Sequence, residues 1–211
     1  MVRVKLISWS NGGVEDPRRL VVLAVKTSAG SLRRRSATYY LKGYSEEGVS
    51  KWLKDAVKFP SVLEHIVFTF LIKEISRVTS HQLVRHRIAS YTQESQRYSV
   101  ISKKYVVPKS IMLKGYEDRF HSIVEESFKL YVEMVKSGVP PEDARYVLPQ
   151  AVSTNILMTV NLRELLHIAC LRLSSKAQWE IRELVNLMID EVARIIPEIR
   201  DLIKLFCHEV S

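Results

Sequence analysis

Apolar and polar residues alternate at the start of the chain, and this pattern predicts a β-strand over residues 2–8 (VRVKLIS). Residues Glu64–Lys73 (EHIVFTFLIK) predict a second strand, which is rich in β-branched and aromatic residues and has apolar groups on both faces. A strand of this kind belongs inside a sheet that is covered on both sides. Residues Val152–Asn161 (VSTNILMTVN) predict a third strand.

Apolar residues at helical spacing predict helices in much of the remaining chain. One begins at Asp16, which can cap it, with Pro17 in its first turn. Others are expected over residues 45–59, 75–84, 116–137, 140–148, 162–173 and 176–206. For the last of these, Ser175 and Gln178 predict a capping box. Its core-facing stripe consists of Ile181, Leu184, Met188, Val192 and Ile195.

The strands and helices are mixed without regular β-α-β alternation, and the sequence has no internal repeat, low-complexity segment or linker. We therefore expect one α+β domain over residues 1–211, with a central sheet flanked by helices. Hydrophobic residues make up 46% of the chain, which is enough to build a core.

The formal net charge of +9 predicts anionic partners, such as nucleic acid, nucleotides or acidic surfaces. A basic surface that only aids solubility gives the same charge balance. The segment SLRRRS (Ser31–Ser36) is expected to be an exposed basic loop. No run of about 18 apolar residues predicts a membrane span. The N-terminus does not resemble a secretory signal, so a cytoplasmic protein is expected.

Cysteines and histidines give no metal or redox pattern. Cys170 and Cys207 lie far apart in the sequence, and we interpret each as a small apolar core residue. His81 and His86 are five residues apart, which differs from the i, i+4 spacing of helical metal ligands. We expect no metal site.

Hydrogen-bond donors are concentrated in RHRIASYTQESQRYS, from Arg85 to Ser99. The chain has only seven glycines and no glycine-rich phosphate loop, so a bound nucleotide would be held mainly by arginines and hydroxyls. In an extended chain Gln93, Ser95 and Arg97 would share one face and form an anion cradle. Alternatively, Arg85 and Arg87 only complement the negative end of the preceding helix.

The donor segment resembles the signature of the flavin-dependent thymidylate synthases (the ThyX family), an RHR triplet followed by two serines and an arginine at fixed offsets. Here these residues are Arg85, His86, Arg87, Ser90, Ser95 and Arg97. The resemblance extends in order over most of residues 20–190, through SVLEHIVFTF, Gln82, ARYVLP and TVNLRELLHIACLRLSSKAQWEI.

This resemblance implies a homotetramer with active sites shared between subunits. It implies reductive methylation of dUMP to dTMP, with 5,10-methylenetetrahydrofolate as the one-carbon donor and NADPH as the reductant through bound FAD. Family members use no covalent enzyme nucleophile, so Ser95 is interpreted as a nucleotide ligand. The basic net charge suits these anionic ligands, and no nucleic acid or membrane partner is expected.

The resemblance also assigns roles to residues. The expected FAD contacts are Ser61, Arg85, His86, Arg87, Gln93, Asn161, Arg163 and His167. The expected dUMP contacts are Gln82, Arg85, Gln93, Ser95, Arg97, Arg145 and Arg172. Arg172 is the expected catalytic residue, because a fixed cation beside the pyrimidine stabilises developing negative charge.

Some positions depart from the family pattern. Thr92-Gln93 replaces a frequent Asn-Glu, Phe59 replaces a histidine of some members, and His167 and Lys176 replace other polar residues. Three alternatives remain. The arginines of the 163–172 region form surface ion pairs with Glu164 and Glu180; the protein binds nucleic acid through SLRRRS and the RHR triplet; or it is a nucleotide-binding relative without catalysis.

Overall fold

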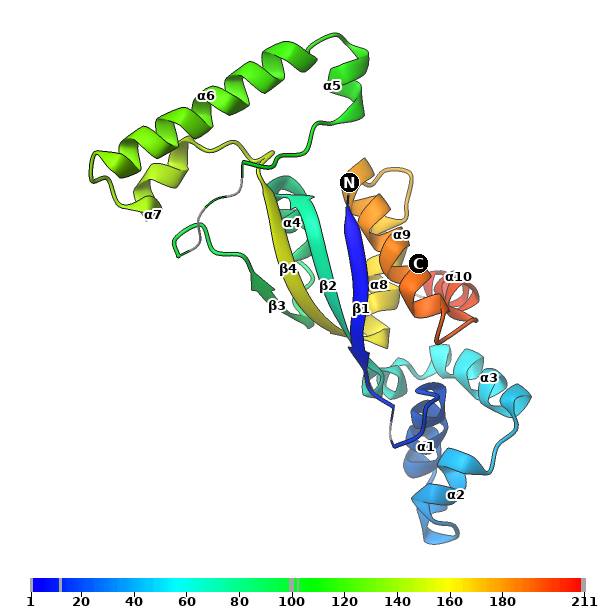
Figure 1. Cartoon of the computed structure of the whole chain (residues 1–211). Helices are drawn as coiled ribbons and strands as arrows, with labels where there is room; N and C mark the ends of the chain where they lie inside the picture. The colour runs from blue at the N-terminus through cyan, green and yellow to red at the C-terminus, as the bar shows by residue number, and fades with distance from the viewer. Residues whose placement is uncertain (1, 12, 99–100, 102, 210–211) are drawn as a thin grey trace.

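The computed structural model describes residues 2–11, 13–98, 101 and 103–209. Its centre is an antiparallel sheet of four strands in the order β1-β2-β4-β3 (Figure 1). These strands are β1 (Arg3–Trp9), β2 (Val67–Ser76), β3 (Ala89–Gln93) and β4 (Ser153–Asn161). The three predicted strands are confirmed, with β2 starting and ending three residues later than expected. The fourth strand, β3, lies inside the donor segment.

One face of the sheet forms the core. Phe68, Phe70 and Ile72 of β2 are fully buried, whereas Leu71 between them is only half-buried. On β4, Leu157 is 42% exposed. The expectation of a sheet covered on both sides is therefore wrong for the described residues of this chain. Apolar side chains on both faces of β2 did not require helices on both faces of the sheet.

Helices α4 (Arg77–Leu83), α8 (Leu162–Arg172), α9 (Trp179–Ala193) and α10 (Ile199–Glu209) cover the buried face. Helices α1 (Arg18–Ser28), α2 (Ala37–Lys42) and α3 (Glu46–Asp55) form a lobe at one end of the molecule (Figure 1). Helices α5 (Lys109–Leu113), α6 (Glu117–Lys136) and α7 (Pro141–Ala144) form an arm at the other end. Short 3₁₀ helices cover Ser31–Arg33, Ala56–Lys58, Pro60–His65 and Arg145–Val147. The mixed fold of one sheet flanked by helices agrees with the predicted α+β class.

The long helix expected after Lys176 is two helices. The chain turns between α9 and α10 around Pro197, which cannot donate the backbone hydrogen bond that a continuous helix needs. The expected capping box is also wrong, because Gln178 is the N-cap and its side chain accepts the N–H groups of Glu180 and Ile181. The predicted apolar stripe is buried as far as Val192.

Cys170 and Cys207 form a disulfide, with their Cα atoms 5.5 Å apart. The interpretation of both residues as apolar core fillers is therefore wrong. Cys170 lies on α8 and Cys207 on α10, and these helices pack together. The disulfide thus ties the last helix of the chain to α8.

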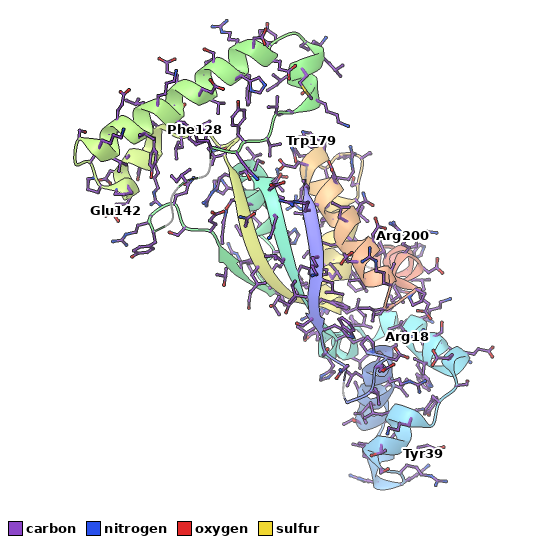
Figure 2. The ribbon with its side chains drawn as sticks, viewed as in Figure 1. Arg18, Tyr39, Phe128, Glu142, Trp179 and Arg200 are labelled. Carbon is purple, nitrogen blue, oxygen red and sulfur yellow. A yellow bond between two sulfur atoms is a disulfide. The ribbon has the colours of Figure 1, made fainter. Side chains whose placement is uncertain are left out.

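The lobe is joined to the end of the chain by an ion cluster around Arg18, which is mostly buried (Figure 2). Its guanidinium bonds to Asp16, Glu198 and Glu46, which come from three separate segments. Asp16 also accepts the Arg18 backbone N–H at 3.0 Å, so it caps α1 as predicted. The Arg18 cluster therefore fixes the lobe against the start of α10.

Among the described residues, no helix is long and apolar enough to cross a membrane. No group of three or more His, Cys, Asp or Glu side chains in that part of the chain is arranged to hold a metal ion. The SLRRRS segment is largely exposed, as expected, although its first half forms a short 3₁₀ turn.

Candidate functional site

The donor segment begins where α4 ends. Ser76 is the N-cap of helix α4, and its Oγ accepts the Thr79 N–H at 3.1 Å. The Glu180 carboxylate at the start of α9 accepts the Ser76 N–H at 2.7 Å and the Ser76 hydroxyl at 2.5 Å. Glu180 is buried, so this double contact anchors α4 to the C-terminal helices. The position of Arg85, just beyond α4, follows from that anchor.

His86 is the buried member of the RHR triplet, whereas Arg85 and Arg87 are exposed. The Arg172 Nε donates to the His86 Nε2 at 3.0 Å, and its Nη2 donates to the backbone oxygen of Gln82 at 3.3 Å. In the described part of the chain no carboxylate pairs with Arg85 or Arg87. The guanidinium groups of Arg85 and Arg87 are therefore exposed beside the His86 imidazole, which already accepts a hydrogen bond from Arg172.

The environment of His86 favours the neutral imidazole. Burial, together with the nearby Arg172 and His167, lowers the pKa of His86 to about 4, and burial has the largest effect. The His167 ring packs edge-on against the His86 ring, with centroids 6.1 Å apart. The buried Glu164 places its Oε1 3.6 Å from the His86 Nδ1. Burial raises the pKa of Glu164 above its ordinary value.

The extended anion cradle predicted for Gln93, Ser95 and Arg97 is wrong. Strand β3 ends at Gln93, whose Nε2 donates to the Ser80 Oγ at 3.0 Å. The chain then turns, and the Ser95 Oγ accepts the Arg97 N–H at 3.1 Å. This turn breaks the two-residue alternation on which the prediction rested. Ser99, at the end of the donor segment, lies outside the described residues.

A second cationic group, of Arg97, Arg145 and Arg77, includes two arginines that contact Glu142 of α7. Arg97 forms an ion pair with Glu142, and the Arg145 Nε donates to the backbone oxygen of Glu142 at 2.9 Å. The Arg77 Nη2 donates to the Glu94 backbone oxygen at 2.7 Å, and burial and the charge of Arg145 lower the pKa of Arg77. Three guanidiniums gathered around few carboxylates can bind a phosphate through paired N–H groups.

The remaining predicted residues lie at the N-terminus of α8. Asn161 caps this helix through its Oδ1, which accepts the Glu164 N–H at 2.8 Å. The Arg163 Nη1 lies 2.5 Å from the Glu64 Oε1. Ser61 is exposed on the 3₁₀ helix that also carries Glu64. This group is separated from Arg172 by the length of α8, about 15 Å for a helix of this size.

The structure also decides the ion-pair alternative for the arginines of α8. Arg163 pairs with Glu64, and Arg172 bonds to His86 and Gln82. Neither of them pairs with Glu180, whose carboxylate bonds to Ser76. The alternative is therefore wrong for the described residues.

Two cavities of the single chain lie away from the RHR triplet. A cavity of about 690 Å³ lies between the arm and the sheet, and its lining includes Lys104, Tyr105, His121 and Trp179. A cavity of about 430 Å³ beside α6 includes Arg97 in its lining. The predicted residues thus form three groups on one chain, around His86, around Arg145 and around Arg163, with no cavity among these two that encloses them together.

Comparison with known proteins places this arrangement in a family. A family model described as "Thymidylate synthase complementing protein" matches residues 5–198. The chain belongs to this family. A flavin-dependent thymidylate synthase of Saccharolobus solfataricus is 43% identical over 205 residues, covering 94% of this chain and 75% of the relative. Another, of Pyrococcus furiosus, is 42% identical over 212 residues, covering 97% and 84%. The resemblance to flavin-dependent thymidylate synthases is therefore confirmed.

The fold is shared with a solved structure, a UMP/dUMP methylase from Streptomyces cacaoi bound with 5-Br dUMP. The TM-score is 0.83 at 22% identity, and the match covers 98% of this chain and 96% of the other. As a member of the flavin-dependent thymidylate synthase family, the chain thus has a fold known from a solved structure, and the predicted fold class is confirmed.

Sequence reasoning missed three residues at the sites of this family member. Glu164 was considered only as an ion-pair partner of arginine, yet it faces His86. Tyr91 was not singled out, although its hydroxyl lies 2.9 Å from the backbone oxygen of His86. Arg77 lies outside the signature, and its Nε is buried without a partner among the described residues. Only the alternation of β3, which points Tyr91 toward the helices, could have indicated one of them.

Proposed function

We propose that the chain catalyses reductive methylation of dUMP to dTMP, with 5,10-methylenetetrahydrofolate as the one-carbon donor and NADPH as the reductant through bound FAD. The observation that carries this proposal is the Arg172–His86 hydrogen bond, which joins the expected catalytic arginine to the RHR triplet of the family signature. Bound FAD would supply the redox chemistry of this reaction, and the residues of this chain would bind and orient it.

The residues around His86 suit the anionic parts of FAD. Arg85 and Arg87 are exposed and have no carboxylate partner in the described part of the chain, so their guanidiniums are available to a pyrophosphate. Gln93 and His167 add hydrogen-bonding groups, and Asn161 would contact FAD from the N-terminus of α8. Ser61 and Arg163 would contact the same cofactor at the other end of α8.

The arginines beside α7 suit the phosphate of dUMP. Arg97 pairs with the Glu142 carboxylate, and Arg145 donates to the Glu142 backbone oxygen. A phosphate would replace the carboxylate as the partner of Arg97 and would lie beside Arg145. Ser95, in the adjoining turn, binds the nucleotide and forms no covalent bond with it. Gln82 contacts the nucleotide from the Arg172 side, and Arg85 and Gln93 are shared between both ligands.

Arg172 would stabilise negative charge on the pyrimidine ring. Its Nε is fixed by His86 and one Nη by the backbone of Gln82, which leaves the rest of the planar fork to face a substrate. A preorganised cation of this kind lowers the barrier without rearranging during the reaction. Arg172 thus acts electrostatically, and no side chain needs to attack the ring.

The separation of the three residue groups on one chain supports a shared site. We propose a homotetramer in which neighbouring copies bring these groups together around each FAD and dUMP. A cytoplasmic location and the absence of a nucleic-acid partner stay predictions.

The deciding experiment is an anaerobic assay for dTMP from dUMP with FAD, NADPH and methylenetetrahydrofolate, read by product mass. Product that depends on flavin supports the proposal. Firm flavin binding without product contradicts catalysis and indicates a binding relative. If neither occurs the proposal is wrong, and salt-dependent binding of DNA or RNA becomes the next measurement.

The role of Arg172 has its own test. Arg172→Ala should keep FAD bound and lower turnover by about 100-fold or more, as loss of a preorganised charge-stabilising group does. The matched control is Arg194→Ala, because Arg194 is 74% exposed and pairs only with Glu191 of its own helical turn. Unchanged turnover in Arg172→Ala would refute this role.

A further inference from the structure

Two side chains of α8 hold the two ring nitrogens of one imidazole. Arg172 donates to the His86 Nε2 at 3.0 Å, and the Glu164 Oε1 lies 3.6 Å from the His86 Nδ1. Glu164 and Arg172 are eight residues apart on the helix, which corresponds to about 12 Å along its axis. The side chains of His86 and Glu164 are only 4% and 8% exposed. The imidazole therefore lies between a carboxyl group and a guanidinium in a region that excludes water.

The contact with Arg172 indicates which ring nitrogen of the imidazole carries the proton. A guanidinium has only N–H donors, so the His86 Nε2 must present a lone pair to it. Neutral His86 then carries its single proton on Nδ1, the nitrogen that faces Glu164. Nearby positive charge and burial favour this neutral form. Either charge state of Glu164 leaves an oxygen that can accept from Nδ1–H.

We propose that Glu164 is a positioning residue for Arg172: it holds the proton of His86 on Nδ1, so that Nε2 stays an acceptor and fixes the guanidinium. Its effect on turnover rests on the proposed function. Carboxyl–histidine pairs that fix a tautomer in this way are common where the second ring nitrogen does chemical work.

The position of Glu164 is not explained by helix capping alone. It stands at the third position of α8, where a capping-box carboxyl would reach back to the backbone of the N-cap, Asn161. Its Oε1 faces His86 instead. The backbone of His86 already has a partner in the Tyr91 hydroxyl, 2.9 Å from its oxygen, but that contact leaves the ring free to rotate. Glu164 supplies a contact at Nδ1 itself.

Two substitutions separate the acceptor function from the charge. Glu164→Gln keeps a carbonyl oxygen at the same place and should turn over within about threefold of the native chain, because Nδ1–H keeps its acceptor. Glu164→Leu removes the acceptor and should lower kcat by about 10- to 100-fold, with the KM for dUMP changed far less. Both are measured at saturating FAD. If Glu164→Leu does not fold, Glu164→Asp replaces it, because its carboxyl is drawn back by one methylene.

A spectroscopic readout follows the tautomer without any turnover. Nitrogen NMR of the chain labelled at its six histidines reports the protonated nitrogen of each ring, and the signal lost in His86→Gln identifies His86. The native chain should show His86 protonated on Nδ1 alone. Glu164→Gln should preserve that signal, and Glu164→Leu should mix the tautomers. Glu198→Gln is the matched control, since Glu198 is also mostly buried but bonds to Arg18 beside the lobe, and it should leave the His86 signal unchanged.

The outcomes separate this proposal from the proposed function. A lower kcat and a mixed tautomer in Glu164→Leu, both restored in Glu164→Gln, support it. Native tautomer in Glu164→Leu overturns it whatever the activity, as does native kcat with an altered tautomer. If the native chain makes no dTMP but the tautomer responds to Glu164→Leu, the proposed function fails and the hold of Glu164 on His86 stands.

Discussion

The Cys170–Cys207 disulfide joins α8 to α10 across 37 positions of sequence. Because α8 also carries His167 and Arg172, the last helix of the chain is covalently tied to the helix that supplies much of the site. Cross-links over loops of this length typically add about 2–4 kcal/mol to stability, chiefly by restricting the unfolded chain.

Reduction of this disulfide is therefore expected to lower the melting temperature by about 5–15 °C for a chain of this size. The measurement is calorimetry with and without dithiothreitol. The double variant Cys170→Ala/Cys207→Ala should melt lower from the start and show no further response to the reductant. Equal melting of the native chain in both conditions would mean that the packing of α10 needs no cross-link.

Removing the Glu142 carboxylate, which pairs with Arg97, should strengthen the binding of anionic ligands. In the Arg97–Glu142 pair both side chains are about half exposed, and such a pair contributes little to stability. A phosphate must displace it, so Glu142→Gln should lower the Kd for dUMP by up to about fivefold at low salt. Isothermal titration measures this. Weaker binding in the variant would show that Glu142 supports Arg97 instead of competing for it.

Loss of Arg18 should loosen the lobe. Arg18→Met leaves the mostly buried Glu198 without its cation, and leaves Asp16 with only Arg19 at 3.5 Å. Breaking such a cluster from one side costs about 3–5 kcal/mol, so thermal or urea unfolding should shift clearly. Arg194→Met is the control and should change stability by less than about 1 kcal/mol, because Arg194 is 74% exposed and its partner Glu191 keeps the Leu6 N–H as a donor. Equal effects of both substitutions would contradict the role of the cluster.

Stability should fall as the solution is acidified below the ordinary pKa of histidine. The pKa of His86 is lowered to about 4 in the folded chain, so between about pH 6.5 and 4 the unfolded chain binds a proton that the folded chain does not. The contribution of His86 is therefore complete above pH 6.5 and is lost as the pH falls toward 4. The raised pKa of Glu164 acts in the opposite sense, with stability lost as the pH rises through its titration.

Urea unfolding across this pH range measures the effect of His86. The free energy of unfolding of His86→Gln should depend less on pH between 6.5 and 4 than that of the native chain. Parallel profiles for the two proteins would mean that His86 is protonated in the fold.

The pattern of apolar residues in the sequence predicted the strands and helices that have one consistently apolar face. The strands around Phe70 and Met158, and the long amphipathic α6, are visible in the sequence because one face of each is consistently apolar. Strand β3 is not visible in this way. Its ASYTQ sequence is polar enough to read as a loop, and it becomes a strand because Ala89 to Gln93 pair with β4, 60 or more residues away.

The candidate site was predicted by composition and family resemblance, whereas its contacts were not. Helical spacing gave no partner for Arg163 or Arg172. The partner of Arg172, His86, comes from a segment 86 positions earlier. The Cys170–Cys207 disulfide was not predicted for the same reason, because the sequence spacing of the two cysteines does not show that α10 packs against α8. Such contacts depend on the tertiary packing of the helices, which local periodicity does not encode.

The double contact between Glu180 and Ser76 makes the donor segment a poor candidate for transplantation. A designer who copied residues 77–97 into another protein would carry over every arginine of the signature. The Glu180 carboxylate, which bonds to Ser76 at the start of α4, lies more than 80 positions downstream and would not be copied. A chain cut short after α8 would likewise keep the whole signature and Arg172. It would lose Glu180, which anchors α4 and so positions the RHR triplet that follows it.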